Sequence, residues 1–143
     1  MEKIKQVFKR ISVFAAVILA AAGLMILSSC AQSEKQIEET LAKIAAEANK
    51  NLPMMTDPQT RLDEIITLPG RKIQYNNTMV DVLAQDIDMD FFKESVGRTL
   101  ASNVKNHPPL ESFRKKNVTF VYRYQDKTGA EIAVFEYTPQ DYK

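Results

Sequence analysis

The chain has 143 residues, a single cysteine and a formal net charge of +1 at pH 7. This length favours one domain. Without the first 30 residues, 15 basic and 17 acidic residues remain, and this nearly neutral balance excludes the strongly basic surface typical of nucleic-acid-binding proteins. The short cluster Arg114, Lys115 and Lys116 is interpreted as a solvated loop.

The first 29 residues have the pattern of a bacterial lipoprotein signal peptide. Four basic residues in MEKIKQVFKR precede residues 11–29, which carry no charge. Residues 27–30, Leu-Ser-Ser-Cys, then resemble a lipobox. This resemblance implies that the chain is cut before Cys30, that the Cys30 thiol receives a diacylglyceryl group and that the new amine is acylated.

An uncleaved transmembrane helix is the alternative interpretation of this segment. Nineteen residues that rise about 1.5 Å each span roughly 28 Å, close to a bilayer core. The small residues before Cys30 and the polar stretch after it favour the lipobox. In both cases the basic N-terminal residues stay in the cytoplasm, so the rest of the chain after Cys30 lies outside it.

The residues after Cys30 indicate the membrane. Ala31 and Gln32 resemble the outer-membrane class of lipoproteins, because that class lacks an aspartate directly after the cysteine. We therefore expect a lipid anchor at the outer membrane, with the protein facing the periplasm. Two or three acyl chains hold a protein essentially permanently.

A short tether, residues 30–36 including the lipidated cysteine, leads to a globular domain over residues 37–143. A helix is predicted over residues 34–51 because its apolar residues recur at helical spacing, and Pro53 ends it. These apolar residues are Ile37, Leu41, Ile44, Ala45, Ala48 and Leu52. The stretch MMTDPQTRLD then reads as an irregular connection, in which Asp57 can cap a turn at Pro58.

Two strands and a second helix follow. The segments DEIITL and RKIQYNNTMVDVL flank a Pro-Gly turn and predict an antiparallel pair of strands. Apolar residues at helical spacing in FFKESVGRTLASNV predict a helix over residues 91–104, which Pro108 and Pro109 close.

The C-terminal segment predicts a hairpin. The runs VTFVYRY and AEIAVFEY alternate aromatic and β-branched residues around a loop that ends at Gly129. The complete order is helix, strand, strand, helix, strand, strand. Short connections favour a two-layer α+β fold, with an antiparallel sheet of about four strands and both helices on one face.

The sequence predicts no catalytic residue, no cofactor-binding residue and no metal ligand. Asp86, Asp88 and Asp90 imitate the start of an EF-hand, but Phe91 and Gly97 stand where the loop needs glycine and glutamate. These acids are interpreted as a helix cap.

We expect the protein not to be an enzyme. The only histidine, at position 107, stands beside two prolines, and the only thiol is Cys30, so neither a histidine-rich metal site nor a catalytic triad can be assembled. Two carboxylates facing each other in a cleft would support an enzyme instead.

Several aromatic residues fall on the predicted strands. They are Tyr75, Phe120, Tyr122, Tyr124, Phe135 and Tyr137. A stacking platform for bases or sugars is one interpretation, and cross-strand packing under the helices is the commoner use of such residues.

Residues 49–78, NKNLPMMTDPQTRLDEIITLPGRKIQYNNT, resemble a group of small, uncharacterised bacterial lipoproteins with an L-P-x-M-x-D-x-x-T-R-L-D pattern. The resemblance implies a disulfide between a cysteine after the second helix and one at the C-terminus. Here the corresponding stretches read SNVKNHPPL and TPQDYK, so packing must supply the typical stabilisation of about 2 to 4 kcal/mol.

The order of elements also resembles the α+β pilotins of type II secretion systems, which bind a short helical tail of a secretin subunit. This resemblance of layout identifies no binding residue. We expect a membrane-anchored envelope lipoprotein whose non-enzymatic domain binds a protein partner, as a pilotin-like assembly factor does. The alternative is a small-ligand-binding or inhibitor lipoprotein, with an apolar pocket lined by Tyr75, Phe120 and Phe135.

Overall fold

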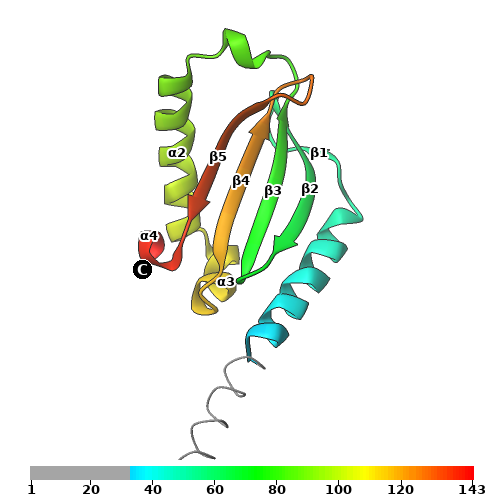
Figure 1. Cartoon of the computed structure of the whole chain (residues 1–143), viewed down its shortest axis with the longest axis vertical. Helices are drawn as coiled ribbons and strands as arrows, with labels where there is room; N and C mark the ends of the chain where they lie inside the picture. The colour runs from blue at the N-terminus through cyan, green and yellow to red at the C-terminus, as the bar shows by residue number, and fades with distance from the viewer. Residues whose placement is uncertain (1–32) are drawn as a thin grey trace, which may run out of the picture. The chain divides into compact units, whose positions relative to one another are not determined.

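Five strands and the helices that pack on them make up the part of the chain that the computed structural model describes, residues 33–143 (Figure 1). Residues 37–143 form one unit, and the packing described below lies within it. After a first helix at residues 33–49, the elements are β1 (Met54–Met55), β2 (Thr60–Leu68), β3 (Lys72–Met79), η1 (Ala84–Asp86), α2 (Met89–Asn106), η2 (Pro108–Leu110), α3 (Glu111–Lys115), β4 (Thr119–Gln125), β5 (Glu131–Tyr137) and α4 (Pro139–Tyr142).

The strands lie in the order β1-β2-β3-β4-β5. The predicted α+β class and the order of the main helices and strands are confirmed. Two details of the sheet differ from the prediction. β3 and β4 pair in parallel, because α2 carries the chain back along the sheet before β4 begins, and a fifth strand, β1, pairs two residues of the predicted irregular connection with β2.

Both long helices cover the same face of the sheet, as predicted. Strand pairing places Ile73 opposite Phe120, and both side chains are buried in one cluster with Leu41 of the first helix and Val104 of α2. Because the two helices contact the same side chains, they lie on one side.

The core divides into two clusters along the strands. The first cluster contains Leu41, Ala45, Ile65, Ile73, Val104, Val118, Phe120 and Tyr142. The second cluster contains Phe92, Leu100, Tyr124, Ile132 and Ala133. Of the two long helices, only α2 contributes to both clusters, since the first helix has no buried residue in the second cluster.

The end of the first helix is bound to the edge of the sheet. The Asn49 side-chain amide donates to the Ile65 carbonyl at 2.8 Å, and the Ile65 amide donates to Asn49 Oδ1 at 2.8 Å. β1 pairs only with Arg61 and Leu62, so the backbone of Ile65 has no strand partner on that side. The Asn49 amide takes the place of that strand.

The opposite face of the sheet carries mostly polar side chains, with Val121 and Val134 among them. Thr78 Oγ1 donates to Asp63 Oδ2 at 2.5 Å, and the Gln125 amide donates to Thr78 Oγ1 at 2.9 Å. On the neighbouring strands, Arg123 pairs with Glu131 at 3.0 Å. These contacts satisfy the polar groups across four strands without a covering layer.

The β4–β5 hairpin is joined to the segment before α2 by Asp126, whose side chain is 3% exposed. The Thr128 hydroxyl and the backbone amides of Ala84, Thr128 and Ala130 donate to its carboxylate, and they hold the pKa of Asp126 well below its ordinary value. The loop ends at Gly129, which adopts φ +90°. The conformation fits a residue without a Cβ.

Packing holds the C-terminus where the resemblance would place a disulfide. The Tyr142 hydroxyl donates to the Val118 carbonyl at 2.7 Å, and its ring centroid lies 5.8 Å from that of Phe120. Val104, near the end of α2, belongs to the same buried cluster. The two stretches without cysteines therefore meet through apolar contacts.

The predicted signal peptide and Cys30 lie outside the described residues. Within residues 33–143, no helix combines the length and the hydropathy that a membrane crossing needs.

We expect Asn49→Ala to lower the free energy of unfolding by about 1 to 3 kcal/mol, because both backbone groups of Ile65 lose their partner. Urea denaturation of the purified protein measures the change. The matched control is Asn51→Ala, an exposed position two residues away, which should stay within about 0.5 kcal/mol of the parent. Equal effects of the two substitutions would contradict the role of Asn49.

Candidate partner-binding groove

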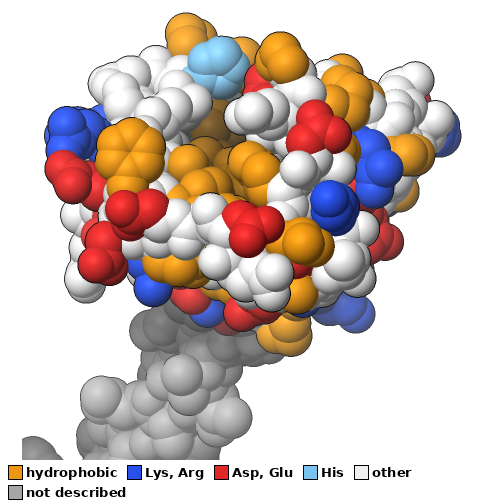
Figure 2. Space-filling view, turned by 90° about the horizontal axis from the view of Figure 1, so that it is seen from above, with side chains coloured by type: hydrophobic (Ala, Val, Ile, Leu, Met, Phe, Trp, Pro, Cys, Tyr) orange, Lys and Arg blue, Asp and Glu red, His pale blue; other side chains and the backbone are white. Residues whose placement is uncertain are grey.

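A groove of about 370 Å³ lies between α2 and the turn that connects β1 to β2. Its floor is the end of the sheet, where Met79 of β3 and Tyr124 of β4 lie beside Leu100 of α2. Seen from above, hydrophobic side chains gather in a hollow on this face (Figure 2). The groove is therefore apolar at its base.

The groove exists because the two helices cover different lengths of the sheet. The first helix ends at residue 49, and the chain turns at Pro53 into β1. α2 continues over the second cluster through Phe92 and Leu100. The upper part of the sheet is thus covered by one helix and bordered on the other side only by a turn.

Two rows of side chains on α2 have different contacts: one packs on the second cluster and the other borders the groove. Phe92, Val96 and Leu100 recur every four residues and pack on the second cluster. A neighbouring row borders the groove and has the same spacing of four residues. It consists of Ser95, Thr99 and Asn103, each three positions after a residue of the first row. The second row is small and polar.

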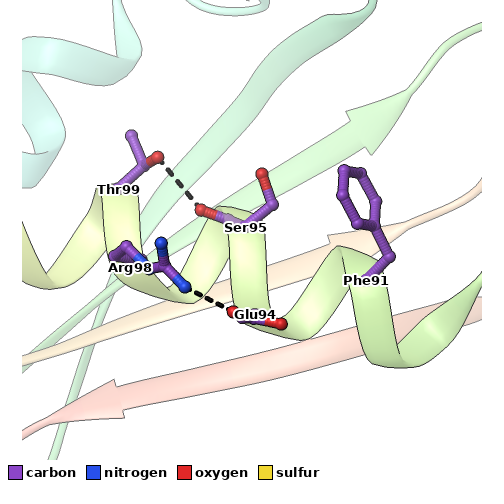
Figure 3. A pocket seen from close by; sticks show the side chains of 5 residues that line it. All are labelled: Phe91, Glu94, Ser95, Arg98 and Thr99. Carbon is purple, nitrogen blue, oxygen red and sulfur yellow. Dashed lines mark hydrogen bonds and ion pairs between the residues drawn. The ribbon is translucent and has the colours of Figure 1, made fainter.

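A second hollow of about 270 Å³ runs along α2 and shares Ser95 and Thr99 with the groove (Figure 3). Its other lining residues are Phe91, Glu94 and Arg98. Glu94 and Arg98 form an ion pair one helical turn apart, and the Thr99 hydroxyl donates to the Ser95 carbonyl at 3.0 Å. The Phe91 side chain is 69% exposed, which makes it a large apolar group at the rim.

The opposite wall of the groove comes from the turn after β1. Asp57 Oδ1 accepts hydrogen bonds from the backbone amides of Gln59 at 2.8 Å and Thr60 at 2.9 Å. This is the capping role that the sequence predicts for Asp57. Burial raises the pKa of Tyr124 to about 12, and the nearby charge of Asp57 adds to the shift, so the Tyr124 hydroxyl stays neutral at physiological pH.

The aromatic residues expected on the strands lie on the helix-covered face and pack across strands. Tyr75 and Tyr122 stack with ring centroids 5.0 Å apart, and Tyr124 meets Phe135 edge to face at 6.0 Å. Burial raises the pKa of Tyr75 to about 12 and that of Tyr122 further. Cross-strand packing is therefore their use in this fold.

Among residues 33–143, Tyr75, Phe120 and Phe135 line neither of the two hollows described above. Phe120 is fully buried in the first cluster, whereas Phe135 packs against the second cluster. The three side chains therefore pack in different parts of the core.

Two of the three acids before α2 lie where the sequence predicted a helix cap, whereas Asp86 is the last residue of η1. Asp88 is the N-cap, and its carboxylate accepts a hydrogen bond from the Phe91 amide at 3.0 Å. Asp90 lies in the first turn of the helix. Within residues 33–143, no group of three or more metal-ligating side chains could hold an ion.

His107 has a structural place at the end of α2. It is the C-cap of the helix, and its carbonyl accepts a hydrogen bond from Arg114 at 3.0 Å. Cys30 lies outside the described residues, so its lipidation stays a prediction.

The groove itself was not predicted from the sequence. Ser95, Thr99 and Asn103 form a polar row beside the apolar row of α2, and this spacing is the signal that could have indicated a second contact surface. Their pairing with the turn at Asp57 depends on contacts between segments far apart in the chain.

Three solved structures are similar to this chain. A protein of Pseudomonas aeruginosa described as secreted has a TM-score of 0.66 and 15% identity, over 78% of this chain and 96% of its own. The pilotin EpsS from the Vibrio vulnificus type 2 secretion system has a TM-score of 0.58 and 13% identity, over 79% and 97%. The type II secretion system pilotin AspS from Vibrio cholerae has a TM-score of 0.61 and 13% identity, over 79% and 98%.

At these identities the similarity shows the fold, and the resemblance in layout to pilotins is confirmed at that level. No curated protein matches the chain. The sequence of residues 36–133 matches the family described as "Domain of unknown function (DUF8479)", and the chain belongs to that family.

Proposed function

We propose that this protein is a lipid-anchored envelope protein that binds a protein partner in the groove beside α2. The observation that carries the proposal is an open groove with an apolar floor, Met79, Leu100 and Tyr124, next to an exposed Phe91. Aromatic residues are enriched in protein interfaces relative to the rest of the protein surface. Its fold, shared with two pilotins, supports a partner-binding role.

The occupant that suits this groove is a helical segment. The walls are a helix on one side and a turn on the other, and the floor is formed by side chains on the ends of two strands. An amphipathic helix binds such a surface by laying its apolar face into it. The adjoining hollow along α2 extends the contact toward Phe91.

The groove does not support catalysis. Among its described lining residues, Asp57 and Tyr124 are the ionisable ones, and the pKa of Tyr124 is raised to about 12. An enzyme with paired carboxylates would need a second acid facing Asp57. We therefore propose a binding protein rather than an enzyme.

A small apolar ligand is the second candidate occupant. The volume of about 370 Å³ falls within the range of small-molecule sites, roughly 300 to 1,000 Å³. Native mass spectrometry of the protein purified from membranes discriminates the two, because a retained small molecule adds a few hundred daltons and a protein partner adds kilodaltons.

We expect Ser95→Trp to abolish partner binding without unfolding the protein. Ser95 is exposed and lines both hollows, so an indole there occupies the space meant for the partner. Recovery of the partner with tagged protein from detergent-solubilised envelopes should fall about tenfold or more, equivalent to a loss of about 1.4 kcal/mol.

The matched control is Ser102→Trp, the same change on the same helix at an exposed position outside the lining residues. It should leave recovery unchanged, and both variants should melt at the temperature of the parent. Normal recovery with Ser95→Trp would refute binding in this groove.

We expect Cys30→Ala to lose the lipid anchor. The parent should incorporate labelled palmitate and be cut before Cys30, whereas the variant should take up no label and stay uncut. Ser28→Ala keeps a small residue before the cysteine and serves as the control that is labelled normally. A variant that is still cut and stays in the same membrane fraction would contradict the anchor.

A further inference from the structure

The groove has a distinct electrostatic character. Among the described residues that line it, Asp57 is the only charged one. The nearest base along α2, Arg98, lies in the adjoining hollow and is paired with Glu94. In Figure 2 both acidic side chains and the histidine are visible at the rim of the hollow. The groove therefore presents a negative charge that no lining base neutralises.

One oxygen of Asp57 remains available to an occupant. Oδ1 accepts the backbone amides of Gln59 and Thr60, and Oδ2 accepts no hydrogen bond from the described residues. The polar lining groups around it include Tyr124, Asn103 and Thr99, each of which carries an oxygen that can accept a hydrogen bond. Each of these three groups can also donate, so the Asp57 carboxylate is the lining group that distinguishes a cationic donor from an acceptor.

The cost of covering Asp57 decides which occupant fits. In the free protein this residue is exposed, so water solvates its carboxylate. A wholly apolar segment lying in the groove would remove that water and leave Oδ2 of the carboxylate without a hydrogen-bond donor, which is unfavourable. A cationic donor would replace the water and form a charge-assisted hydrogen bond.

We infer that Asp57 is a specificity-determining residue that selects partner segments with a lysine or arginine beside their apolar face. This inference rests on the proposed function, because it assumes that a helical segment enters the groove. The partner is thus a basic amphipathic helix. Segments with an acid at that position are rejected by repulsion from Asp57.

Three synthetic peptides test the inference. They are 18-residue amphipathic helices with the same apolar face, and they carry lysine, glutamine or glutamate at one position at the edge of that face. Fluorescence anisotropy with the full-length protein in detergent measures their dissociation constants. We expect the lysine peptide to bind about 5 to 10 times more tightly than the glutamine peptide, and the glutamate peptide to bind most weakly.

Asp57→Asn removes the charge and keeps an Oδ1 acceptor for Gln59 and Thr60, so the turn is retained. With this variant the three peptides should bind equally. The matched control is Asp81→Asn, an exposed acid outside the lining residues, which should keep the preference for lysine.

Each other outcome has a separate meaning. Equal binding of the three peptides to the parent protein overturns the inference, and so does a lysine preference that survives in Asp57→Asn. Both results leave the proposed function of the groove standing. No binding of any peptide up to about 1 mM, or equal binding to Ser95→Trp, shows that helices do not enter the groove and overturns the proposed function.

Discussion

The open groove depends on the place where the first helix stops. At residue 49 the Asn49 amide binds both backbone groups of Ile65, and this pair of hydrogen bonds fixes the helix end to the edge of β2. Beyond it the chain turns through Pro53 into β1. The side of the groove that faces α2 is therefore formed by the turn at Asp57 and not by a helix, and Met79 and Tyr124 lie between this turn and α2.

Packing elsewhere in the domain stabilises the fold although one part of the sheet is not covered by a second helix. α2 packs on both clusters, and the first cluster closes around Phe120 with Tyr142 from the C-terminal turn. Polar pairs across the opposite face need no further layer. The first cluster and α2 therefore provide the stability, while the groove side of the sheet stays free for an occupant.

The helices and the main strands could be predicted because their signals are local. Apolar spacing identified both long helices, and alternation identified the hairpin of β4 and β5. The parallel pairing of β3 with β4 depends on which strands become neighbours, which no local pattern specifies. β1 has two residues, which are too few for a periodic signal. Asp57 forms a wall of the groove only because its turn faces α2, and that depends on the tertiary fold.

Site-specific photocrosslinking in cells tests most directly whether a protein occupies the groove. Benzoylphenylalanine replaces Gln59, which is exposed and lines the groove, or Gln74, which the strand register places on the opposite face of the sheet. We expect a protein adduct from position 59 and none from position 74. An adduct of equal yield from position 74, or none from position 59, would contradict partner binding in the groove.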